Sequence, residues 1–235
     1  MRFSRRTIGL RTAGLAGAAL FGLLAAAAAP SAAAEPVRLL AFGDSLTHGY
    51  GLPSGETFPE QLEAALRADG LEVTVINAGN SGDTTAGGRA RLDWALADDP
   101  DAVILELGAN DGLRGLDPAA TYDNLDAILA RLKEADLPVL IAGMLAPPNL
   151  GREYTDAFNA VYPRLARKYG APLYPFFLDG VAMDKALNQS DGIHPNAAGV
   201  AEIVQRIKPH VVRLLEATSL AERPAAGAEP PDAGN

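Results

Sequence analysis

Residues 37–46 read VRLLAFGDSL, a mainly apolar run that ends at Gly43 and is followed by Asp44 and Ser45. A short, nearly continuous apolar run bounded by a glycine is typical of a strand that is covered on both faces. Four further runs of this kind occur, each bounded by Gly, Pro, Asn or Asp: Val73–Ala78, Ala102–Leu107, Val139–Met144 and Leu173–Phe177. Together the five runs predict a parallel sheet between two layers of helices.

Segments with helical periodicity separate these runs, as the connections of a parallel sheet require. Apolar residues recur at helical spacing in four of them, over residues 59–69, 121–135, 154–169 and 197–217. Pro163 and Pro209 are expected to kink or interrupt the last two helices, because proline lacks an amide hydrogen. The sequence therefore predicts an α/β fold, a three-layer α/β/α sandwich around a five-stranded parallel sheet.

Residues 1–34 have the pattern of a secretory signal peptide. A basic start that contains Arg5 and Arg6 is followed by an apolar run over residues 13–29 and by small residues up to Ala34. The arginine pair also partly matches a twin-arginine export signal. An uncleaved membrane anchor is the alternative, because the apolar run is almost long enough to span a bilayer. We expect cleavage near Ala34 and export of the protein to the periplasm or the medium.

The remainder of the chain is expected to form one domain over residues 35–220. No linker or internal repeat divides this stretch, and its length suits a single well-buried core. Residues 221–235 consist mostly of proline, alanine, glycine and acidic side chains. Because such a composition buries too little apolar surface to offset the entropy of ordering, it predicts a disordered tail.

The composition also limits the possible partners. The formal net charge is −9, and the predicted signal peptide carries arginines but no acidic residue. A surface this acidic repels nucleic acid and anionic membranes, so neither is expected as a partner, and no stable membrane span is expected in the mature form. With no cysteine and three scattered histidines, the chain predicts no disulfide, metal site or other cofactor. A small-molecule substrate is expected, and the oligomeric state stays open.

Polar residues follow the first three predicted strands, at points that a parallel sheet brings to one edge. Ser45 follows the first strand, Gly82 the second and Asn110 the third. A serine nucleophile needs a base and a group that orients the base, and the Asp191–His194 stretch before the last helix contains both. Backbone N–H groups at Ser45 and Gly82, with the Asn110 amide, could hold a developing oxyanion. Taken singly, these residues could equally be a helix cap and turns.

Four short blocks in this order resemble the SGNH, or GDSL-type, esterase superfamily. The blocks are Gly43-Asp44-Ser45-Leu46, Asn80-Ser81-Gly82-Asp83-Thr84, Gly108-Ala109-Asn110-Asp111 and Asp191-Gly192-Ile193-His194. Further stretches, Glu106–Gly115 and Pro175–Phe177, are similar to the branch of that superfamily that contains multifunctional thioesterases, lysophospholipases and arylesterases. The resemblance implies the flavodoxin-like fold of that superfamily.

The resemblance also implies a role for each residue of the blocks. It makes Ser45 the nucleophile, His194 the base and then the acid, and Asp191 the orienting carboxylate. The oxyanion would be held by the backbone N–H groups of Ser45 and Gly82 and by the Asn110 side chain. The implied activity is the hydrolysis of carboxylic esters or thioesters through an acyl-enzyme, with aryl esters, acyl chains and lysophospholipids as substrates.

The loops after the third and fourth predicted strands bear on the choice of substrate. Leu113, Leu116, Pro147 and Leu150 are predicted to line an apolar groove for an acyl chain, although plain loop packing is the alternative. A carbohydrate esterase that removes acetyl groups is a second possibility, but aromatic residues that could stack on sugars make up only 6% of the chain. A flavodoxin-like phosphate- or nucleotide-binding module is a third, with the phosphate at the Ser45 turn.

Three residues near the blocks or outside them need separate interpretations. Asp44 is expected to fix the turn before Ser45 by hydrogen bonding rather than to take part in chemistry. His48 follows Ser45 by about one helical turn, so it is either an exposed spectator or a group that alters access to the serine. His210 lies in the last predicted helix, where it is expected to be structural.

Overall fold

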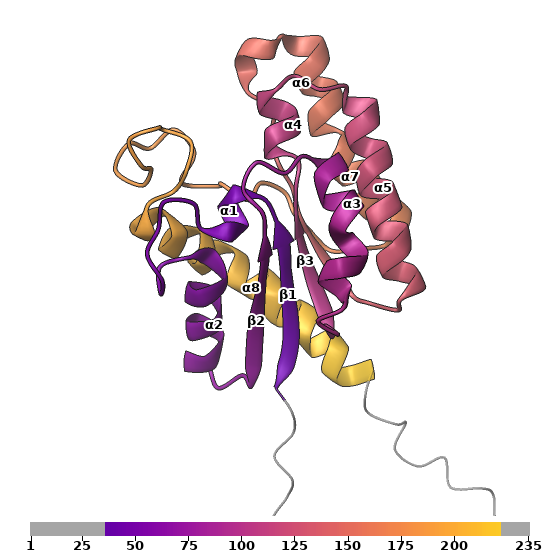
Figure 1. Cartoon of the computed structure of the whole chain (residues 1–235), viewed down its shortest axis with the longest axis vertical. Coiled ribbons are helices and arrows are strands. Elements are labelled where there is room, and N and C mark those ends of the chain that lie inside the picture. The colour runs from indigo at the N-terminus through magenta and orange to yellow at the C-terminus, as the bar shows by residue number, and fades with distance from the viewer. Residues whose placement is uncertain (1–35, 222–235) are drawn as a thin grey trace, which may run out of the picture. The chain divides into compact units, whose positions relative to one another are not determined.

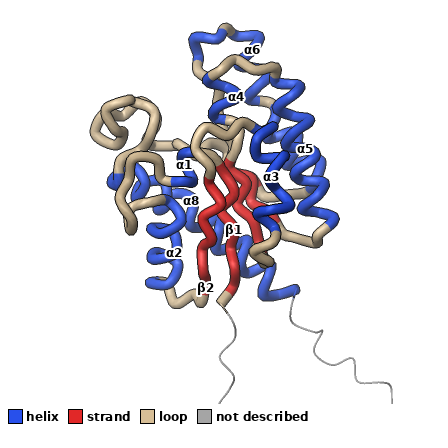
Figure 2. The backbone as a smooth tube through the Cα atoms, viewed as in Figure 1, coloured by secondary structure: helices blue, strands red, loops and turns tan. Residues whose placement is uncertain are grey.

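A computed structural model of the chain describes residues 36–221. It contains a five-stranded sheet, which lies between helices (Figures 1 and 2). The strands are β1 (Val37–Gly43), β2 (Val73–Gly79), β3 (Ala102–Glu106), β4 (Val139–Ala142) and β5 (Leu173–Tyr174). They lie in the order β2-β1-β3-β4-β5, and every neighbouring pair is parallel. The predicted α/β fold with five parallel strands is confirmed.

Helices cover both faces of this sheet, which makes the described domain a three-layer sandwich (Figure 1). The helices are α1 (Ser45–His48), α2 (Phe58–Ala68), α3 (Thr85–Leu96), α4 (Ala109–Leu113), α5 (Pro118–Glu134), α6 (Arg152–Asn159), α7 (Val161–Tyr169) and α8 (Ala197–Ala221), with a 3₁₀ turn η1 (Pro148–Leu150). Helices α2 and α8 pack together on one face, whereas α3, α5 and α7 lie on the other. The short helices α1 and α4 directly follow the carboxyl ends of β1 and β3.

The hydrophobic core is built around the neighbouring strands β1 and β3. Every residue of β3 is buried, and so are Leu39, Leu40 and Phe42 of β1. Helix α2 adds Phe58, Leu62 and Leu66 from one face, while α5 adds Ile128 and Leu132 from the other. This double coverage is the reason that the central strands read as continuous apolar runs rather than as alternating ones.

Strands β4 and β5 are shorter than their apolar runs by two and three residues, and β3 is shorter by one. Strand β4 ends at Ala142 instead of Met144, and β5 spans only Leu173 and Tyr174 instead of reaching Phe177. Pro175 has no amide hydrogen, so it cannot extend the ladder, and Phe177 N–H donates to Gly143 O across the loop at 2.8 Å. The apolar residues beyond the ends of β4 and β5 therefore belong to the loops at the carboxyl edge of the sheet.

The two internal prolines have different effects. The predicted helix over 154–169 is two helices, α6 and α7, that meet at Ala160, and Pro163 lies in the first turn of α7. Proline is tolerated there because the first turn has no internal partner for its amide. Helix α8, in contrast, is not interrupted at Pro209, where Ile207 and Val211 on either side are fully buried.

Helix α3 was not predicted from the sequence. Gly87 and Gly88 lie in its first turn, and its apolar residues form no clear stripe, so helical periodicity is weak. The Thr84 side chain nevertheless caps the helix by accepting from Gly87 N–H. A side chain at Gly88 would lie 2.3 Å from Leu107 Cδ1, so glycine here permits close packing of α3 on the chain after β3.

The predicted signal peptide (1–34) and the predicted tail beyond residue 221 lie outside the described residues. Residues 36–221 belong to one compact unit, in which the predicted domain over 35–220 lies. Within this described part of the chain, no helix is long and apolar enough to cross a membrane.

Candidate active site

Ser45 is the first residue of α1, and only Asp44 separates this helix from the end of β1. The turn between the two elements depends on Asp44, a fully buried residue whose carboxylate accepts from Leu46 N–H at 3.0 Å. Gly49, with a φ of +86°, ends the helix after a single turn. The prediction that Asp44 fixes this turn by hydrogen bonding is confirmed, and the turn presents Ser45 at the carboxyl edge of the sheet.

His194 and Asp191 reach the same edge from the loop that precedes α8, drawn in orange in Figure 1. His194 Nε2 lies 2.9 Å from Ser45 Oγ, although 149 residues separate the two in sequence. On the other side of the ring, His194 Nδ1 lies 2.6 Å from Asp191 Oδ2. The three side chains therefore form one continuous hydrogen-bonded series.

Asp191 is held in its ionised form. The His194 ring and the backbone N–H groups of His194 and Ile193 donate to its carboxylate, and these bonds lower its pKa to about 2. An ionised Asp191 keeps the imidazole proton on Nδ1, which leaves Nε2 free to accept from the Ser45 hydroxyl. The arrangement can also stabilise an imidazolium once His194 has taken that proton.

The Asn110 side chain lies next to the Ser45 turn. Its Nδ2 donates to Asp83 O at 2.9 Å and to Asp44 Oδ2 at 3.2 Å. Gly82, with a φ of +88°, is one residue before Asp83, and its carbonyl accepts from Arg114 Nη2 at 3.0 Å. Because both amide hydrogens of Asn110 are engaged, a bound oxyanion would have to replace one of these two acceptors.

A cavity of about 570 Å³ opens beside Ser45, His194 and Asn110. Its other lining residues are mainly apolar: Leu46, Ala109, Leu113, Met144, Leu145, Ala146, Pro147, Pro148, Phe176, Leu178, Ala182, Met183, Asn188, Gly192 and Ile193. The predicted groove residues Leu113 and Pro147 are thus in its walls. Leu116 and Leu150 are not, which corrects that part of the prediction.

The reason for this correction lies in the loop after α4. Leu116 follows Gly115, whose φ of +61° turns the chain away from the α4 axis. The Leu116 carbonyl accepts from Tyr154 OH at 2.8 Å, which ties this loop to α6, and the Leu116 side chain is exposed. Leu150 is the last residue of η1, beyond the two prolines that line the cavity.

Glu106 lies beside the Ser45 turn, and no role was predicted for it. It ends β3 and is completely buried, and its Oε2 accepts from Thr47 Oγ1 at 2.8 Å and from Asp44 N at 3.3 Å. Its Oε1 has no partner among the described residues. Burial and the nearby Asp44 raise the pKa of Glu106 well above its usual range, which favours the neutral acid. The sequence feature that could have identified Glu106 is a charged residue at the end of an otherwise apolar run.

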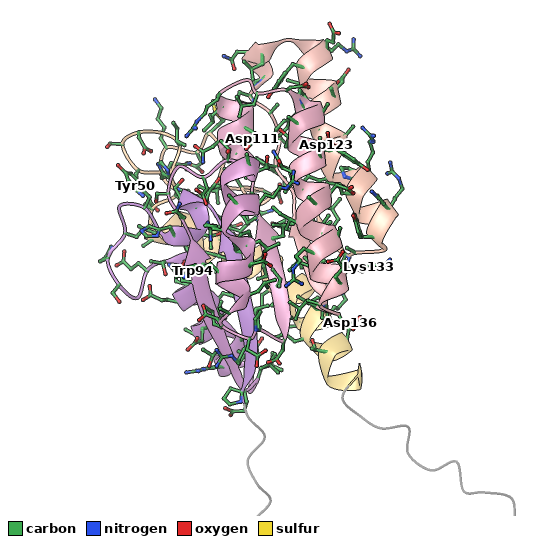
Figure 3. The ribbon with its side chains drawn as sticks, turned by 45° about the vertical axis from the view of Figure 1, so that its right-hand side comes forward. Tyr50, Trp94, Asp111, Asp123, Lys133 and Asp136 are labelled. Carbon is green, nitrogen blue, oxygen red and sulfur yellow. The ribbon has the colours of Figure 1, made fainter. Side chains whose placement is uncertain are left out.

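Tyr50 is a second residue beside the site that no sequence pattern marks. Its ring centroid lies 4.6 Å from that of His194, and it stands beside the loops at the carboxyl edge (Figure 3). Gln189 Nε2 donates to the carbonyls of Tyr50 and Pro195, at 2.7 and 2.9 Å. Tyr50 and Gln189 thereby hold the His194 loop against the α1 turn.

The other two histidines stay apart from this series. His48 is exposed, with Nδ1 3.2 Å from Gly79 O, so it faces β2 rather than the cavity. His210 packs edge-on against Tyr174, with ring centroids 5.2 Å apart. Among residues 36–221, no group of three or more His, Cys, Asp or Glu side chains could hold a metal ion.

Asp44 provides a pH-dependent prediction. Burial raises its pKa from 3.8 to about 6, so the folded protein keeps a proton that the unfolded chain loses between pH 4 and 6. Stability therefore falls as the pH rises through this window, by about 3 kcal/mol in total. Relative to wild type, Asp44→Asn is expected to gain stability from pH 4 to 6 and to stay level above pH 6. Urea denaturation at pH 4, 5, 6 and 7 checks this, and a pH-independent difference would contradict it.

A serine at a strand-to-helix turn, linked through a histidine to an ionised carboxylate at the carboxyl edge of a parallel sheet, defines a serine hydrolase on an α/β/α sandwich. A phosphate-binding module would not need Asn110 and His194 beside Ser45, so this arrangement argues against that alternative. Residues 41–202 match the model of the GDSL-like Lipase/Acylhydrolase family, which covers more than half of the sequence. The chain belongs to this family, and it is an ester hydrolase.

Individual relatives agree with this assignment. The chain is 40% identical over 179 residues to an arylesterase of Vibrio mimicus, which covers 76% of this chain and 90% of that protein. It is 41% identical over 165 residues to "Thioesterase 1/protease 1/lysophospholipase L1" of Escherichia coli K12, which covers 70% and 78%. The crystal structure of AlinE4, an SGNH-hydrolase family esterase, is similar with a TM-score of 0.65 and 49% identity, covering 77% of this chain and 97% of that one.

Proposed function

We propose that this protein hydrolyses carboxylic esters and thioesters through an acyl-enzyme on Ser45, with aryl esters and lysophospholipids among its substrates. The observation that carries the proposal is the series of contacts from Ser45 through His194 to Asp191, with distances of 2.9 and 2.6 Å. Serine is a weak nucleophile unless a base within hydrogen-bond reach takes its proton, and this geometry supplies that base.

In the proposed reaction, Ser45 Oγ bonds to the carbonyl carbon while His194 Nε2 takes the hydroxyl proton, and the carbonyl oxygen becomes an oxyanion. As this tetrahedral intermediate collapses, the bond to the leaving group breaks and His194 gives its proton to the departing alkoxide or thiolate. Water then attacks the acyl-enzyme with His194 as base, which releases the acid and restores Ser45. Asp191 remains ionised throughout and stabilises the imidazolium.

We assign the oxyanion to the backbone N–H groups of Ser45 and Gly82 and to Asn110 Nδ2. Asn110→Ala is expected to lower kcat about a hundredfold to a thousandfold with little change in KM, because the negative charge develops only in the transition state. Steady-state hydrolysis of p-nitrophenyl butyrate checks this. The matched control is Asn124→Ala on α5, whose side chain bonds to Thr85 and Arg89 and to no other residue that the structure describes. A kcat for Asn110→Ala within about threefold of wild type would remove Asn110 from this role.

The cavity supports an acyl chain as the group that is transferred. Leu113, Met144, Phe176 and Leu178 line it beside Ser45, and apolar walls favour a hydrocarbon over a sugar ring. We expect kcat/KM for p-nitrophenyl esters to rise from the acetate to medium acyl chains, and acyl-CoA thioesters to be cleaved as well. Acetylated xylose is the comparison substrate, and a strong preference for it over medium-chain esters would favour the carbohydrate esterase instead.

We further propose that the protein is exported with cleavage near Ala34. The support is the basic and apolar pattern of residues 1–34 and the small residues that end it. Mass spectrometry of the protein recovered from the periplasm or the medium tests the proposal. A mature chain that begins at Glu35 is the expected result, whereas intact residues 1–34 in a membrane fraction would indicate an anchor.

A further inference from the structure

Arg91 on α3 lies behind the loops that carry the three proposed oxyanion donors. Each nitrogen of its guanidinium has a different acceptor: Nη2 donates to Gly43 O at 2.8 Å, Nη1 to Ala78 O at 2.9 Å, and Nε to Asp83 Oδ2 at 2.5 Å. The guanidinium carbon also stands 4.3 Å from the centre of the Phe42 ring. One side chain thus joins the carboxyl ends of β1 and β2 to the loop after β2.

The Gly43 carbonyl, which accepts from Arg91 Nη2, links Arg91 to the turn that carries Ser45. The Gly43 carbonyl is two residues before Ser45, and it also accepts from Asn80 N–H at 3.0 Å. Arg91 and Asn80 therefore fix from one side the backbone that places the Ser45 N–H. No other charged side chain donates to this carbonyl among the described residues.

The Asp83 carboxylate, which accepts from Arg91 Nε, links Arg91 to the other two proposed donors, the Gly82 N–H and the Asn110 amide. Asp83 directly follows Gly82, and its carboxylate is shared between Arg91 Nε and Asn80 Nδ2. Its backbone carbonyl in turn accepts from Asn110 Nδ2 at 2.9 Å. Displacement of Asp83 would therefore move both the Gly82 backbone and the Asn110 amide.

The geometry requires an arginine rather than any cation. The three acceptors lie in three directions around one group, which suits a planar guanidinium with fixed N–H directions. Only 18% of the Arg91 side chain and 13% of the Asp83 side chain are exposed, so the pair is shielded from solvent. A lysine ammonium at the end of a flexible stem could not serve all three acceptors in the same geometry.

We propose that Arg91 is a positioning residue for the oxyanion site: it sets the spacing between the Ser45 turn and the Gly82–Asp83 loop, and through Asp83 the direction of the Asn110 amide. The inference rests on the proposed function, since it assigns Arg91 to the donors of that reaction. Arg91 does not line the cavity, so it acts through these groups rather than on the substrate.

The proposal predicts a defect in kcat rather than in KM. Arg91→Lys and Arg91→Ala are expected to lower kcat for p-nitrophenyl butyrate by about tenfold and about a hundredfold, since displacements near 1 Å in a reactive site cost rate on this scale. KM should stay within about threefold of wild type, because the ester carbonyl carries little charge in the ground state. Active sites are counted with a fluorophosphonate at completion, so that kcat refers only to folded protein.

Chemical rescue and a matched arginine distinguish positioning from general stability. Guanidinium ion at millimolar concentration should restore part of kcat to Arg91→Ala, whereas ammonium at the same concentration should not. The control is Arg131→Ala on α5, which removes a single exposed ion pair with Asp93 of α3. It should leave kcat and KM unchanged.

Two results would overturn the proposal. Either an unchanged kcat per active site in both Arg91 variants, with only the folded fraction reduced, or an equal loss of kcat in Arg131→Ala would make Arg91 merely structural. Failure of the proposed function has a different signature, because Ser45→Ala would then retain hydrolysis whatever happens at Arg91.

Discussion

Replacement of Ser45 with alanine is expected to lower kcat for p-nitrophenyl butyrate by about a millionfold, to the residual rate that substrate binding and the oxyanion donors alone support. Ser45 Oγ forms the acyl bond and gives its proton to His194 Nε2, 2.9 Å away, so its loss removes the covalent route completely. The oxyanion donors can then act only on direct attack by water. Steady-state hydrolysis by purified protein measures the effect, and circular dichroism reports whether the variant is folded.

The matched control for this substitution is Ser54→Ala. Ser54 lies in the loop before α2, and its hydroxyl donates to Glu60 Oε1, so the change removes an exposed hydroxyl away from the cavity. A fluorescent fluorophosphonate should label wild type and Ser54→Ala at one site each and should not label Ser45→Ala. A Ser45→Ala protein with more than about a hundredth of wild-type kcat would show that the serine mechanism is wrong.

Replacement of His194 with alanine is expected to have nearly the same effect, about a millionfold in kcat. Without the imidazole, no other side chain of residues 36–221 is hydrogen-bonded to Ser45 Oγ and able to take its proton, and the ionised Asp191 lies beyond the ring. Because nucleophile and base act as one unit, the double variant Ser45→Ala/His194→Ala should be no slower than either single variant. Single-turnover hydrolysis of p-nitrophenyl butyrate measures all three proteins on one scale.

His48→Ala is the control for the histidine, since His48 belongs to the same short helix as Ser45 but its ring faces Gly79. We expect its kcat/KM to stay within about threefold of wild type. A loss of activity in the double variant equal to the product of the two single losses would mean that Ser45 and His194 act independently. That result would contradict the proposed proton transfer.

The fold was predictable because its signals are local. Strands buried on both faces must be continuously apolar, so VRLLAFGDSL and the later runs marked all five strands. Helix α3 escaped prediction because Gly87 and Gly88 weaken its propensity, while packing on Leu107 and a cap from Thr84 stabilise it. Strand β5 was overextended, since Pro175 stops the ladder although apolar residues continue.

The candidate site was predictable only in part. Ser45, Gly82 and Asn110 each follow a strand, so the parallel order alone brings them to one edge. The residues that position these three groups have no comparable pattern in the sequence. No pattern in the sequence distinguishes Arg91 from the other arginines, and its acceptors are two backbone carbonyls and one carboxylate from other segments.

The sequence by itself therefore determined the layered fold, the family and the residues that can react, because strand burial and the order of the four blocks are written along the chain. Only the tertiary structure decided which groups support those residues and which side chains surround the substrate. Leu113 lines the cavity whereas Leu116 does not, and Glu106 faces Thr47 rather than solvent. These outcomes depend on loop directions and on contacts between segments far apart in sequence, which no local pattern encodes.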